Sequence, residues 1–430
     1  MKEKQGVIEI KRFLSVLIAL SLLLGLASCS GNREDNSEIP DVTLSEEELK
    51  SVKETEVRAV WISYTELGNL ILSNNTQEQF TAQITNRFRQ LSDFGFNTII
   101  VHSRAFADAF YKSDLFPTSS YMTGTQGGTM LFDPLAIMVA AAHQLNMKIE
   151  AWVNPYRITY SQNLDGLAAT NPAKVWLSDA APENDTWVIK TEKGYFFNPA
   201  VKEVQDLIVA GVEEIVKNYE VDGIHFDDYF YPSTEESIDA GDYAKYTSEG
   251  GKLALVEWRC NNVSTLVKTV YAKIKSIKPA VTFGISPSAS IKNNLSTHYA
   301  DLTLWATEEG YVDYLCPQIY FGFTSETMPF ISTYKSWQRM MKKSKVKLYV
   351  GLALYKSGTV DEFADTTDGS DNSTPKYEFI NNTDLMARQV SYLRQTSGYK
   401  GFFIYSYSYL FDNDGACVQS EVENLRTALQ

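Results

Sequence analysis

The chain has 430 residues and a formal net charge of −14 at pH 7, with 53 acidic residues against 39 Lys and Arg. So acidic a protein argues against nucleic acid as a partner, because the phosphate backbone binds positively charged surfaces. The four cysteines are widely spaced, so they indicate neither a disulfide framework nor a metal or redox motif. We therefore expect no metal and no cofactor.

The N-terminus has the pattern of a bacterial export signal. Two basic residues, Lys11 and Arg12, precede the apolar stretch Phe13–Ala27, which is too short for a comfortable membrane span. It ends in Leu-Ala-Ser-Cys at Cys29, which resembles the lipobox of bacterial lipoproteins. The sequence predicts a signal peptide over residues 1–28 and lipidation of Cys29.

Residues 29–54 are rich in acidic and small polar side chains and show no periodicity, so they predict a flexible tether. We expect the lipid on Cys29 to anchor the protein to the cell envelope, at the outer membrane. The acidic pair Glu34 and Asp35 resembles a surface-export signal, and both the periplasmic and the surface face remain open.

Residues 55–430 alternate short β-branched or aromatic runs with amphipathic helical patterns. The expected strands are Val57–Ser63, Asn97–Arg104, Lys148–Asn154, Gly223–Asp228, Thr282–Pro287, Val312–Tyr320, Lys347–Tyr355 and Gly401–Tyr407. The expected helices are Thr76–Phe94, Pro134–Leu145, Ala200–Tyr219, Lys252–Ile277, Ser296–Thr307, Met328–Lys343, Asp384–Gln395 and one after Asn413. Eight repeats of this kind predict a (β/α)₈ TIM barrel. A doubly wound open sheet is the alternative, but no glycine-rich phosphate loop follows the first strand.

Polar and aromatic residues cluster where seven of these strands end. In a barrel those ends open onto one face, which is where active sites lie. The long insertions Thr159–Asn198 and Pro232–Glu249 are expected to border that mouth and contact substrate.

The fourth strand carries the strongest chemical signal. His225, Asp227 and Tyr229 alternate and share one face, whereas Asp228 lies at the rim where the strand ends. Adjacent carboxylates raise at least one pKa, which suits a general acid at neutral pH. Asp227 and Asp228 are therefore the predicted catalytic pair, with Asp108 and Glu150 in reserve. The simpler alternative is that the two aspartates only cap the following loop.

Other residues near the strand ends are candidates for substrate binding, since aromatic faces stack on sugar rings and polar side chains bind hydroxyls or a carboxylate. These candidates are Arg104, Asp108, Trp152, Asn154, Tyr156, Arg157, His225, Tyr229, Gln318, Tyr320, Tyr355 and Tyr405.

Adjacent aspartates after the fourth strand resemble the substrate-assisted N-acetylhexosaminidases. There Asp227 would orient the acetamide and Asp228 would protonate the leaving oxygen. The Asp-Gly-x-x-x-Asp pattern is also similar to α-amylase-type barrels, with Asp227 as the nucleophile, and to the chitinases. Tyr229 stands at the position of the chitinase glutamate, so a chitinase mechanism is disfavoured.

Several motifs together resemble the glycosyl-hydrolase-like family 10, which is distinct from the xylanases also numbered ten. They are Val57–Trp61, Asp108–Tyr111, Phe132–Leu135, Glu150–Arg157, Gly223–Pro232 and Pro317–Tyr320. The resemblance runs from about Glu56 to Tyr349, and implies a (β/α)₈ barrel that hydrolyses glycosidic bonds in the cell envelope. Family members linked to peptidoglycan are thought to cut glycan strands that lack stem peptides, so peptidoglycan is the favoured polysaccharide substrate.

Two other functions remain open. A non-catalytic glycan-binding lipoprotein would use the same aromatic residues without the carboxylates. A metal-dependent polysaccharide deacetylase would use the Asp-Asp pair as ligands, but it needs further histidines, and the four in this chain form no His-x-x-x-His.

Overall fold

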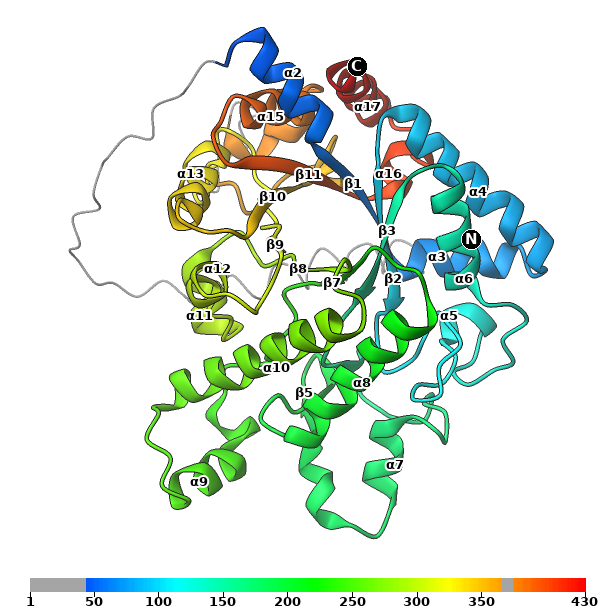
Figure 1. The fold of residues 1–430 in the computed structure, drawn as a ribbon, viewed down its shortest axis with the longest axis vertical. Coiled ribbons are helices and arrows are strands. Elements are labelled where there is room, and N and C mark those ends of the chain that lie inside the picture. The colour runs from blue at the N-terminus through cyan, green and yellow to red at the C-terminus, as the bar shows by residue number, and fades with distance from the viewer. Residues whose placement is uncertain (1–43, 366–373) are drawn as a thin grey trace.

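The computed structural model describes residues 44–365 and 374–430, and within them eight parallel strands close into a barrel. The order around the barrel is β1-β11-β10-β9-β8-β7-β3-β2, with helices lying around the strands (Figure 1). The predicted (β/α)₈ architecture is therefore confirmed. Cys29, the predicted signal peptide and most of the predicted tether lie outside the described residues. Among the described helices, none is long and apolar enough for a membrane span.

All eight predicted strands form. They are β1 (Val57–Ile62), β2 (Thr98–Arg104), β3 (Lys148–Val153), β7 (Gly223–Phe226), β8 (Thr282–Ile285), β9 (Tyr314–Leu315), β10 (Lys347–Leu352) and β11 (Tyr399–Tyr405). The principal outer helices are α4 (Gln77–Phe94), α6 (Pro134–Gln144), α8 (Lys202–Asn218), α10 (Leu255–Ile277), α12 (Leu302–Thr307), α13 (Phe330–Met341), α15 (Leu385–Arg394) and α17 (Ala416–Leu429). The predicted strand Val312–Tyr320 is the least accurate, because only two of its residues pair as a strand.

Local signals in the sequence account for where the helices begin and end. Thr76 caps α4 by accepting from the amide of Gln79, and Gly95 ends it with a φ of 110° that favours glycine. Asp133 caps α6 directly before Pro134, which suits the first helical position. The buried side of α4 is apolar and packs against the barrel, so each such helix covers one part of the sheet.

The barrel interior is filled by alternate residues of the strands. Trp61, Trp152, Tyr314, Tyr349 and Phe403 belong to one buried cluster there. β8 approaches this cluster so closely that a Cβ on Gly284 would lie 1.8 Å from the Tyr314 ring, so only glycine fits. Because the interior is packed solid, substrate has access only to the rim where the strands end.

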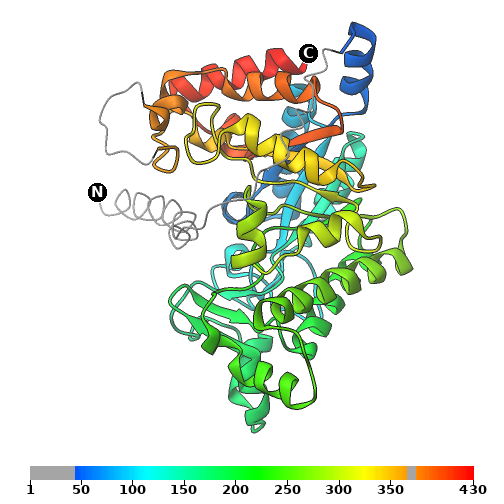
Figure 2. The same ribbon diagram turned by 90° about the vertical axis from the view of Figure 1, so that its left-hand side faces the viewer.

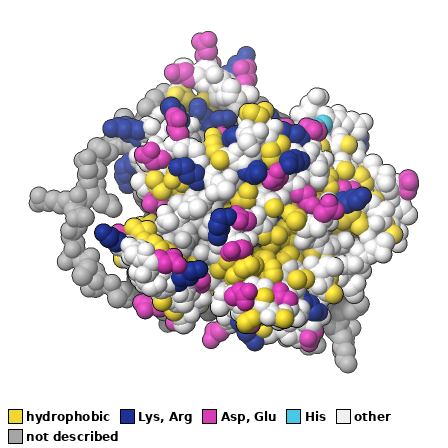
Figure 3. Space-filling model, turned by 60° about the horizontal axis from the view of Figure 1, so that its bottom comes forward, with side chains coloured by type: hydrophobic (Ala, Val, Ile, Leu, Met, Phe, Trp, Pro, Cys, Tyr) yellow, Lys and Arg dark blue, Asp and Glu magenta, His cyan; other side chains and the backbone are white. Residues whose placement is uncertain are grey.

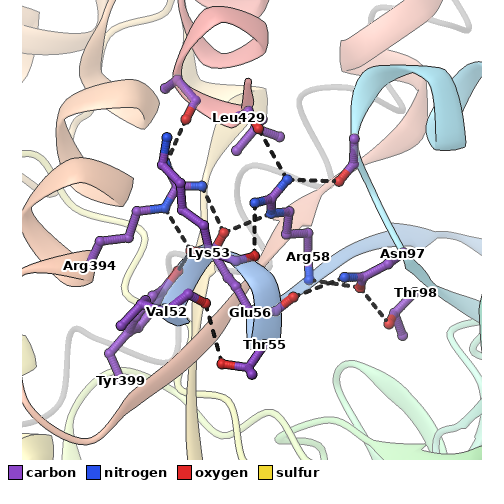
Figure 4. Close-up of polar contacts among 12 residues, drawn as sticks. Val52, Lys53, Thr55, Glu56, Arg58, Asn97, Thr98, Arg394, Tyr399 and Leu429 are labelled. Atoms are coloured by element: carbon purple, nitrogen blue, oxygen red, sulfur yellow. Dashed lines mark hydrogen bonds and ion pairs between the residues drawn. The ribbon is translucent and has the colours of Figure 1, made fainter. Parts of the chain in front are cut away.

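A buried ionic cluster closes the barrel between its first and last strands (Figure 4). The Glu56 carboxylate precedes β1 and accepts from Arg394 Nε at 2.9 Å, Arg58 Nε at 2.7 Å and Tyr399 Oη at 2.7 Å. Arg58 and Arg394 also donate to carbonyl oxygens in α17, of Leu429 and Ala428 respectively. The two ends of the described chain are thereby fixed to each other and to the barrel.

The predicted tether is wrong at its C-terminal end. Residues 46–55 form helix α2, capped by a reciprocal pair of hydrogen bonds between Ser45 and Glu48. The sequence suggested that the three glutamates at positions 46–48 belong to a disordered acidic segment. They lie instead in the first turn of α2, where negative charge is favourable. Leu44 also donates to the Gln395 side chain at 3.0 Å, so the folded part begins before residue 55.

Both long insertions contain secondary structure of their own. The first forms the antiparallel sheet β4-β6-β5 (Arg157–Thr159, Gly194–Phe197, Val188–Thr191) and helix α7 (Pro172–Ser178). The second contains helix α9 (Ala240–Ser248). Asn198 Nδ2 donates to Asp242 at 2.9 Å, which joins the two insertions. Figure 2 shows them at the end of the molecule away from α15 and α17.

One face of the surface carries charges of both signs. Figure 3 shows one face on which acidic and basic side chains are interspersed among hydrophobic ones, without a stripe of basic residues. That face offers no electrostatic footprint for nucleic acid.

Candidate active site

The predicted pair of aspartates lies at the mouth of the barrel, and the two side chains have different surroundings. Asp227 follows β7 and is 3% exposed, whereas Asp228 is half-buried and lines a pocket. The alternation along β7 accounts for this difference, since His225 and Asp227 point into the barrel while Asp228 belongs to the rim.

Asp227 is held by three donors. Trp152 Nε1 donates to its Oδ2 at 3.2 Å, the Asn154 side-chain amide donates to the same oxygen, and the Tyr229 amide donates to Oδ1 at 3.2 Å. Burial raises the pKa of the Asp227 carboxyl to about 7, the charge of Arg157 opposes the rise, and the charge of Asp228 adds to it. Asp227 therefore titrates near neutral pH, among donors that favour its ionised form.

A relay of hydrogen bonds from Tyr64, just after β1, and His102 on β2 sets the orientation of Asn154. The Tyr64 amide donates to His102 Nδ1 at 3.1 Å, so the imidazole proton lies on Nε2 and is donated to Asn154 Oδ1 at 2.6 Å. The Asn154 NH₂ group must then face Asp227. His102 also stacks on Trp152, with ring centroids 3.3 Å apart. Burial lowers the pKa of His102, which keeps it neutral in this role.

Asp228 lies against the pocket that opens beside it. Gln318 Nε2 donates to Asp228 Oδ1 at 3.2 Å and to the Ser286 carbonyl at 2.9 Å, which fixes the amide in place. The pocket is lined by residues that follow β7, β8, β9 and β10, including Asp228, Ser288, His298, Gln318, Tyr320 and Tyr355. Tyr320, Tyr355 and Tyr405 contact one another, with centroids 5.7 to 6.5 Å apart. An acid, an amide and aromatic rings around one opening are the parts of a sugar site.

Arg157 and Tyr229 form the other side of the mouth. The Arg157 guanidinium lies 4.1 Å from the centroid of the Tyr229 ring, which is 39% exposed. The structure thus brings together Asp227, Asp228, Trp152, Asn154, Arg157, Tyr229, Gln318, Tyr320, Tyr355 and Tyr405 from the predicted set.

Four predicted substrate-binding residues lie elsewhere. Arg104 is 1% exposed, donates to the Pro155 carbonyl at 3.1 Å and packs on Phe116. Asp108, 2% exposed, accepts from Gln126 Nε2 at 3.1 Å. Asp108 is bonded within the loop after β2, and Arg104 links that loop to the loop after β3, so both lie away from open space. Their polarity at a strand end suggested the mouth, but their contacts show that they stabilise these loops.

Tyr156 and His225 are enclosed completely. Tyr156 is part of the main hydrophobic core. His225 lies inside the barrel, where Trp61 Nε1 donates to its Nε2 at 3.2 Å and its Nδ1 faces the Tyr314 hydroxyl at 2.7 Å. Asn154 is also 0% exposed, so it reaches a substrate only through Asp227.

The reserve acid Glu150 lies one layer below the mouth. Its carboxylate accepts from the Tyr314 hydroxyl and from Thr282 Oγ1 at 3.0 Å. Burial raises the pKa of Glu150 to about 7, but the packed interior separates it from substrate.

Sequence reasoning missed two residues of the site, His102 and His298. His102 lies two residues after Ile100, which points into the barrel interior. The alternation of side chains along β2 could therefore have predicted that His102 points inward as well. His298 follows α11 (Ile291–Thr297) in a loop without a strand-end pattern, and it lines the pocket with Asp228. Burial lowers the pKa of His298, and the nearby charge of Asp228 opposes that change.

No metal site is evident in the part of the chain that the structure describes. There, no three His, Cys, Asp or Glu side chains come together in a way that could hold an ion. Residues 44–365 and 374–430 therefore provide no set of metal ligands for the deacetylase hypothesis.

This fold and mouth define a TIM-barrel protein with a carboxylate pair and an aromatic-lined pocket after the barrel strands. A family model described as "Glycosyl hydrolase-like 10" matches residues 56–366. The chain belongs to the glycosyl hydrolase-like 10 family, as the sequence motifs indicated.

Curated relatives carry related names. Glycosyl hydrolase YngK of Bacillus subtilis is 35% identical over 324 residues, which cover 70% of this chain. The chain spans only 61% of the length of YngK. Glycosyl hydrolase DigH of Escherichia coli is 30% identical over 373 residues, covering 80% of this chain and 83% of DigH.

Solved structures of low identity support the fold. The PgaB (BpsB) glycoside hydrolase domain from Bordetella bronchiseptica is similar with a TM-score of 0.55 at 11% identity, covering 87% of this chain and 99% of that domain. The α-L-fucosidase isoenzyme 2 from Paenibacillus thiaminolyticus gives a TM-score of 0.51 at 13% identity, covering 86% of this chain and 49% of that protein. At these identities the likeness concerns the barrel alone.

Proposed function

We propose that this protein is a glycoside hydrolase that cleaves the glycan strands of peptidoglycan, with Asp227 and Asp228 as its catalytic pair. The observation that supports the proposal most is the contrast between these adjacent carboxylates. Asp228 lines an open pocket, while Asp227 is buried and accepts three hydrogen bonds. From the pocket Asp228 can reach a glycosidic oxygen as an acid, while the donors around Asp227 favour its ionised form and suit it to a stabilising charge.

The proposed mechanism is substrate-assisted, because adjacent residues cannot flank a scissile bond as two separate side chains do. Asp228 protonates the glycosidic oxygen as the bond to the anomeric carbon breaks. The acetamido oxygen of the same sugar attacks that carbon, while ionised Asp227 accepts the acetamido N–H. Water then opens the cyclic intermediate, with Asp228 taking the proton back.

The reaction is tested by digesting peptide-free glycan strands with the full chain in detergent and weighing the products. Hydrolysis adds one water to each pair of new ends. Products with anhydro ends, one water lighter, would indicate a lytic transglycosylase and contradict the proposal.

The pH profile is expected to report on Asp227. Because Asp227 must be ionised to accept the acetamido N–H, kcat/KM should fall as the pH drops below about 7, the pKa of Asp227 in the folded protein. Asn154→Leu removes a donor to the ionised carboxylate, so it should move this acidic limb to higher pH by about one unit. Profiles of kcat/KM from pH 5 to 9 measure both effects.

Asn171→Leu is the matched control. Asn171 is a buried asparagine that donates to the Ala107 carbonyl at 2.8 Å, outside the site. Its loss should lower stability and leave the acidic limb in place. An acidic limb that stays unmoved in Asn154→Leu would show that this side chain does not govern Asp227.

We also propose that the protein is lipid-anchored at Cys29 in the outer membrane, on the support of the export signal and the cysteine that follows it. Cys29→Ala should remove the protein from the outer-membrane fraction and abolish its lipid label, because a signal peptidase that cuts before cysteine would no longer process it. Fractionation and labelling with a fatty-acid analogue measure the change. Cys417→Ala is the control, and a membrane-bound, unlabelled wild type would contradict the anchor.

A further inference from the structure

Arg157 is a buried cation without a hydrogen-bonding partner. Arg157 begins β4, shortly after the end of β3 at the mouth, and is 3% exposed. Within residues 44–365 and 374–430, no hydrogen bond or ion pair engages its guanidinium, and Nε is enclosed without any acceptor. Burying a charge is costly, and the nearby charge of Asp227 offsets this cost without supplying a hydrogen bond, so the N–H groups still lack an acceptor.

Three aromatic rings surround this guanidinium. Its central carbon lies 4.1 Å from the ring centroid of Tyr229, 4.7 Å from that of Tyr160 and 5.6 Å from that of Phe106. Aromatic faces stabilise a cation but accept no conventional hydrogen bonds, so the N–H groups stay available. We call Arg157 with these three residues the Arg157 box.

The box lies next to the proposed catalytic pair. The charge of Arg157 acts on the Asp227 carboxyl, yet no ion pair joins the two side chains in the described residues. Tyr229 is two residues beyond Asp227 and is 39% exposed, so one wall of the box faces solvent. A group bound there would sit beside the sugar whose bond is cut.

We propose that the Arg157 box is a subsite for a carboxylate on a sugar ring bound beside Asp227. This inference rests on the proposed function and narrows its substrate to an acidic glycan. A planar guanidinium takes a carboxylate with two parallel, charge-assisted hydrogen bonds, which a single hydroxyl cannot match. The carboxylate could belong to a lactyl ether, as in peptide-free peptidoglycan, or to a uronic acid.

The test compares each glycan with its own neutral derivative. Peptide-free peptidoglycan strands and a uronic-acid polymer are each used as such and after conversion of their carboxylates to amides. For the full-length wild type, amidation of the recognised glycan should lower kcat/KM by about 10- to 100-fold, mainly through KM, as expected for a lost charge-assisted pair. In Arg157→Gln the acidic and amidated forms should be cleaved equally well.

Two further variants make the result decisive. Arg104→Gln changes a buried arginine that donates to the Pro155 carbonyl, so it should keep the preference for the acidic form. Arg157→Lys keeps the charge without the planar fork, and should keep a reduced preference. If Arg157→Gln fails to fold, Arg157→Lys tests the carboxylate subsite in its place.

The outcomes separate the inference from the proposed function. If the wild type cleaves acidic and amidated strands equally, or if Arg157→Gln lowers both rates by the same factor, the box does not bind a carboxylate although the hydrolase function stands. If the wild type cleaves neither form of either glycan, the proposed function fails as well. The glycan whose acidic form shows the Arg157-dependent preference is the source of the carboxylate.

Discussion

Asp228→Asn should lower the rate of glycan cleavage by roughly 10²- to 10⁴-fold while leaving glycan binding intact, because general acid catalysis contributes about this much. The side chain lies against the pocket, and the oxygen of an asparagine can still accept from Gln318 Nε2 as the carboxylate does. Reducing-end release and isothermal calorimetry measure cleavage and binding separately.

Asp222→Asn is the matched control for this variant. Asp222 directly precedes β7 and accepts from the Ile149 amide at 2.9 Å, at the opposite end of the strand. Cleavage by this control should stay within a few-fold of the wild type. If Asp228→Asn cleaved as fast as the control, Asp228 would not be the acid. A wild type that bound glycans and cleaved none would support the binding-module alternative.

Glu56→Gln should destabilise the folded chain by about 3–5 kcal/mol, the typical cost of removing one partner of a buried ionic cluster. The Glu56 carboxylate lies between Arg394 and Arg58, and its side chain is fully buried (Figure 4). The variant leaves two arginines facing a neutral amide where the barrel closes. Denaturant unfolding monitored by tryptophan fluorescence measures the loss.

The pH dependence of this loss has a defined sign. Burial alone would raise the pKa of Glu56, but its bonds with Arg394, Tyr399 and Arg58 outweigh burial and hold the pKa below the ordinary 4.5. Its contribution to stability is therefore complete above pH 4.5 and is lost as the pH falls through the lowered pKa. The gap between wild type and Glu56→Gln should narrow below pH 4.5.

Glu423→Gln serves as the control for Glu56. Glu423 pairs with Arg426 at 3.4 Å on the surface, and its side chain is 72% exposed. Its loss should change the free energy of unfolding by less than about 1 kcal/mol. Equal effects of the two variants would show that the buried cluster does not stabilise the barrel closure.

The sequence was most informative where one periodicity dominates. β7 could be placed because Gly223, His225 and Asp227 alternate within a buried run, and α4 could be placed from its cap and its apolar stripe. β9 was overestimated because Val312–Tyr320 is mostly apolar or aromatic despite Asp313 and Gln318, while only Tyr314 and Leu315 are paired as a strand. An apolar segment of a sequence indicates burial. How many of its residues pair as a strand depends on the neighbouring strands, which the segment itself does not specify.

The site was only partly predictable for a related reason. A polar residue at a strand end has the same signature whether it faces the mouth, as Gln318 does, or stabilises a loop, as Arg104 does. Contacts that join distant segments decide between the two. His298 and Asp228 are separated in the chain by β8 and by helices α9, α10 and α11, yet they line one pocket.

The most direct measurement of the proposed chemistry is how kcat/KM depends on the leaving group. Aryl glycosides of the N-acetylated glycan repeat, with phenols of graded acidity, are compared for the wild type and Asp228→Asn. If Asp228 protonates the departing oxygen, the variant should be nearly as fast as the wild type with the most acidic phenol and fall far behind as the phenol becomes more basic. An equal loss with every phenol would contradict an acid at this position.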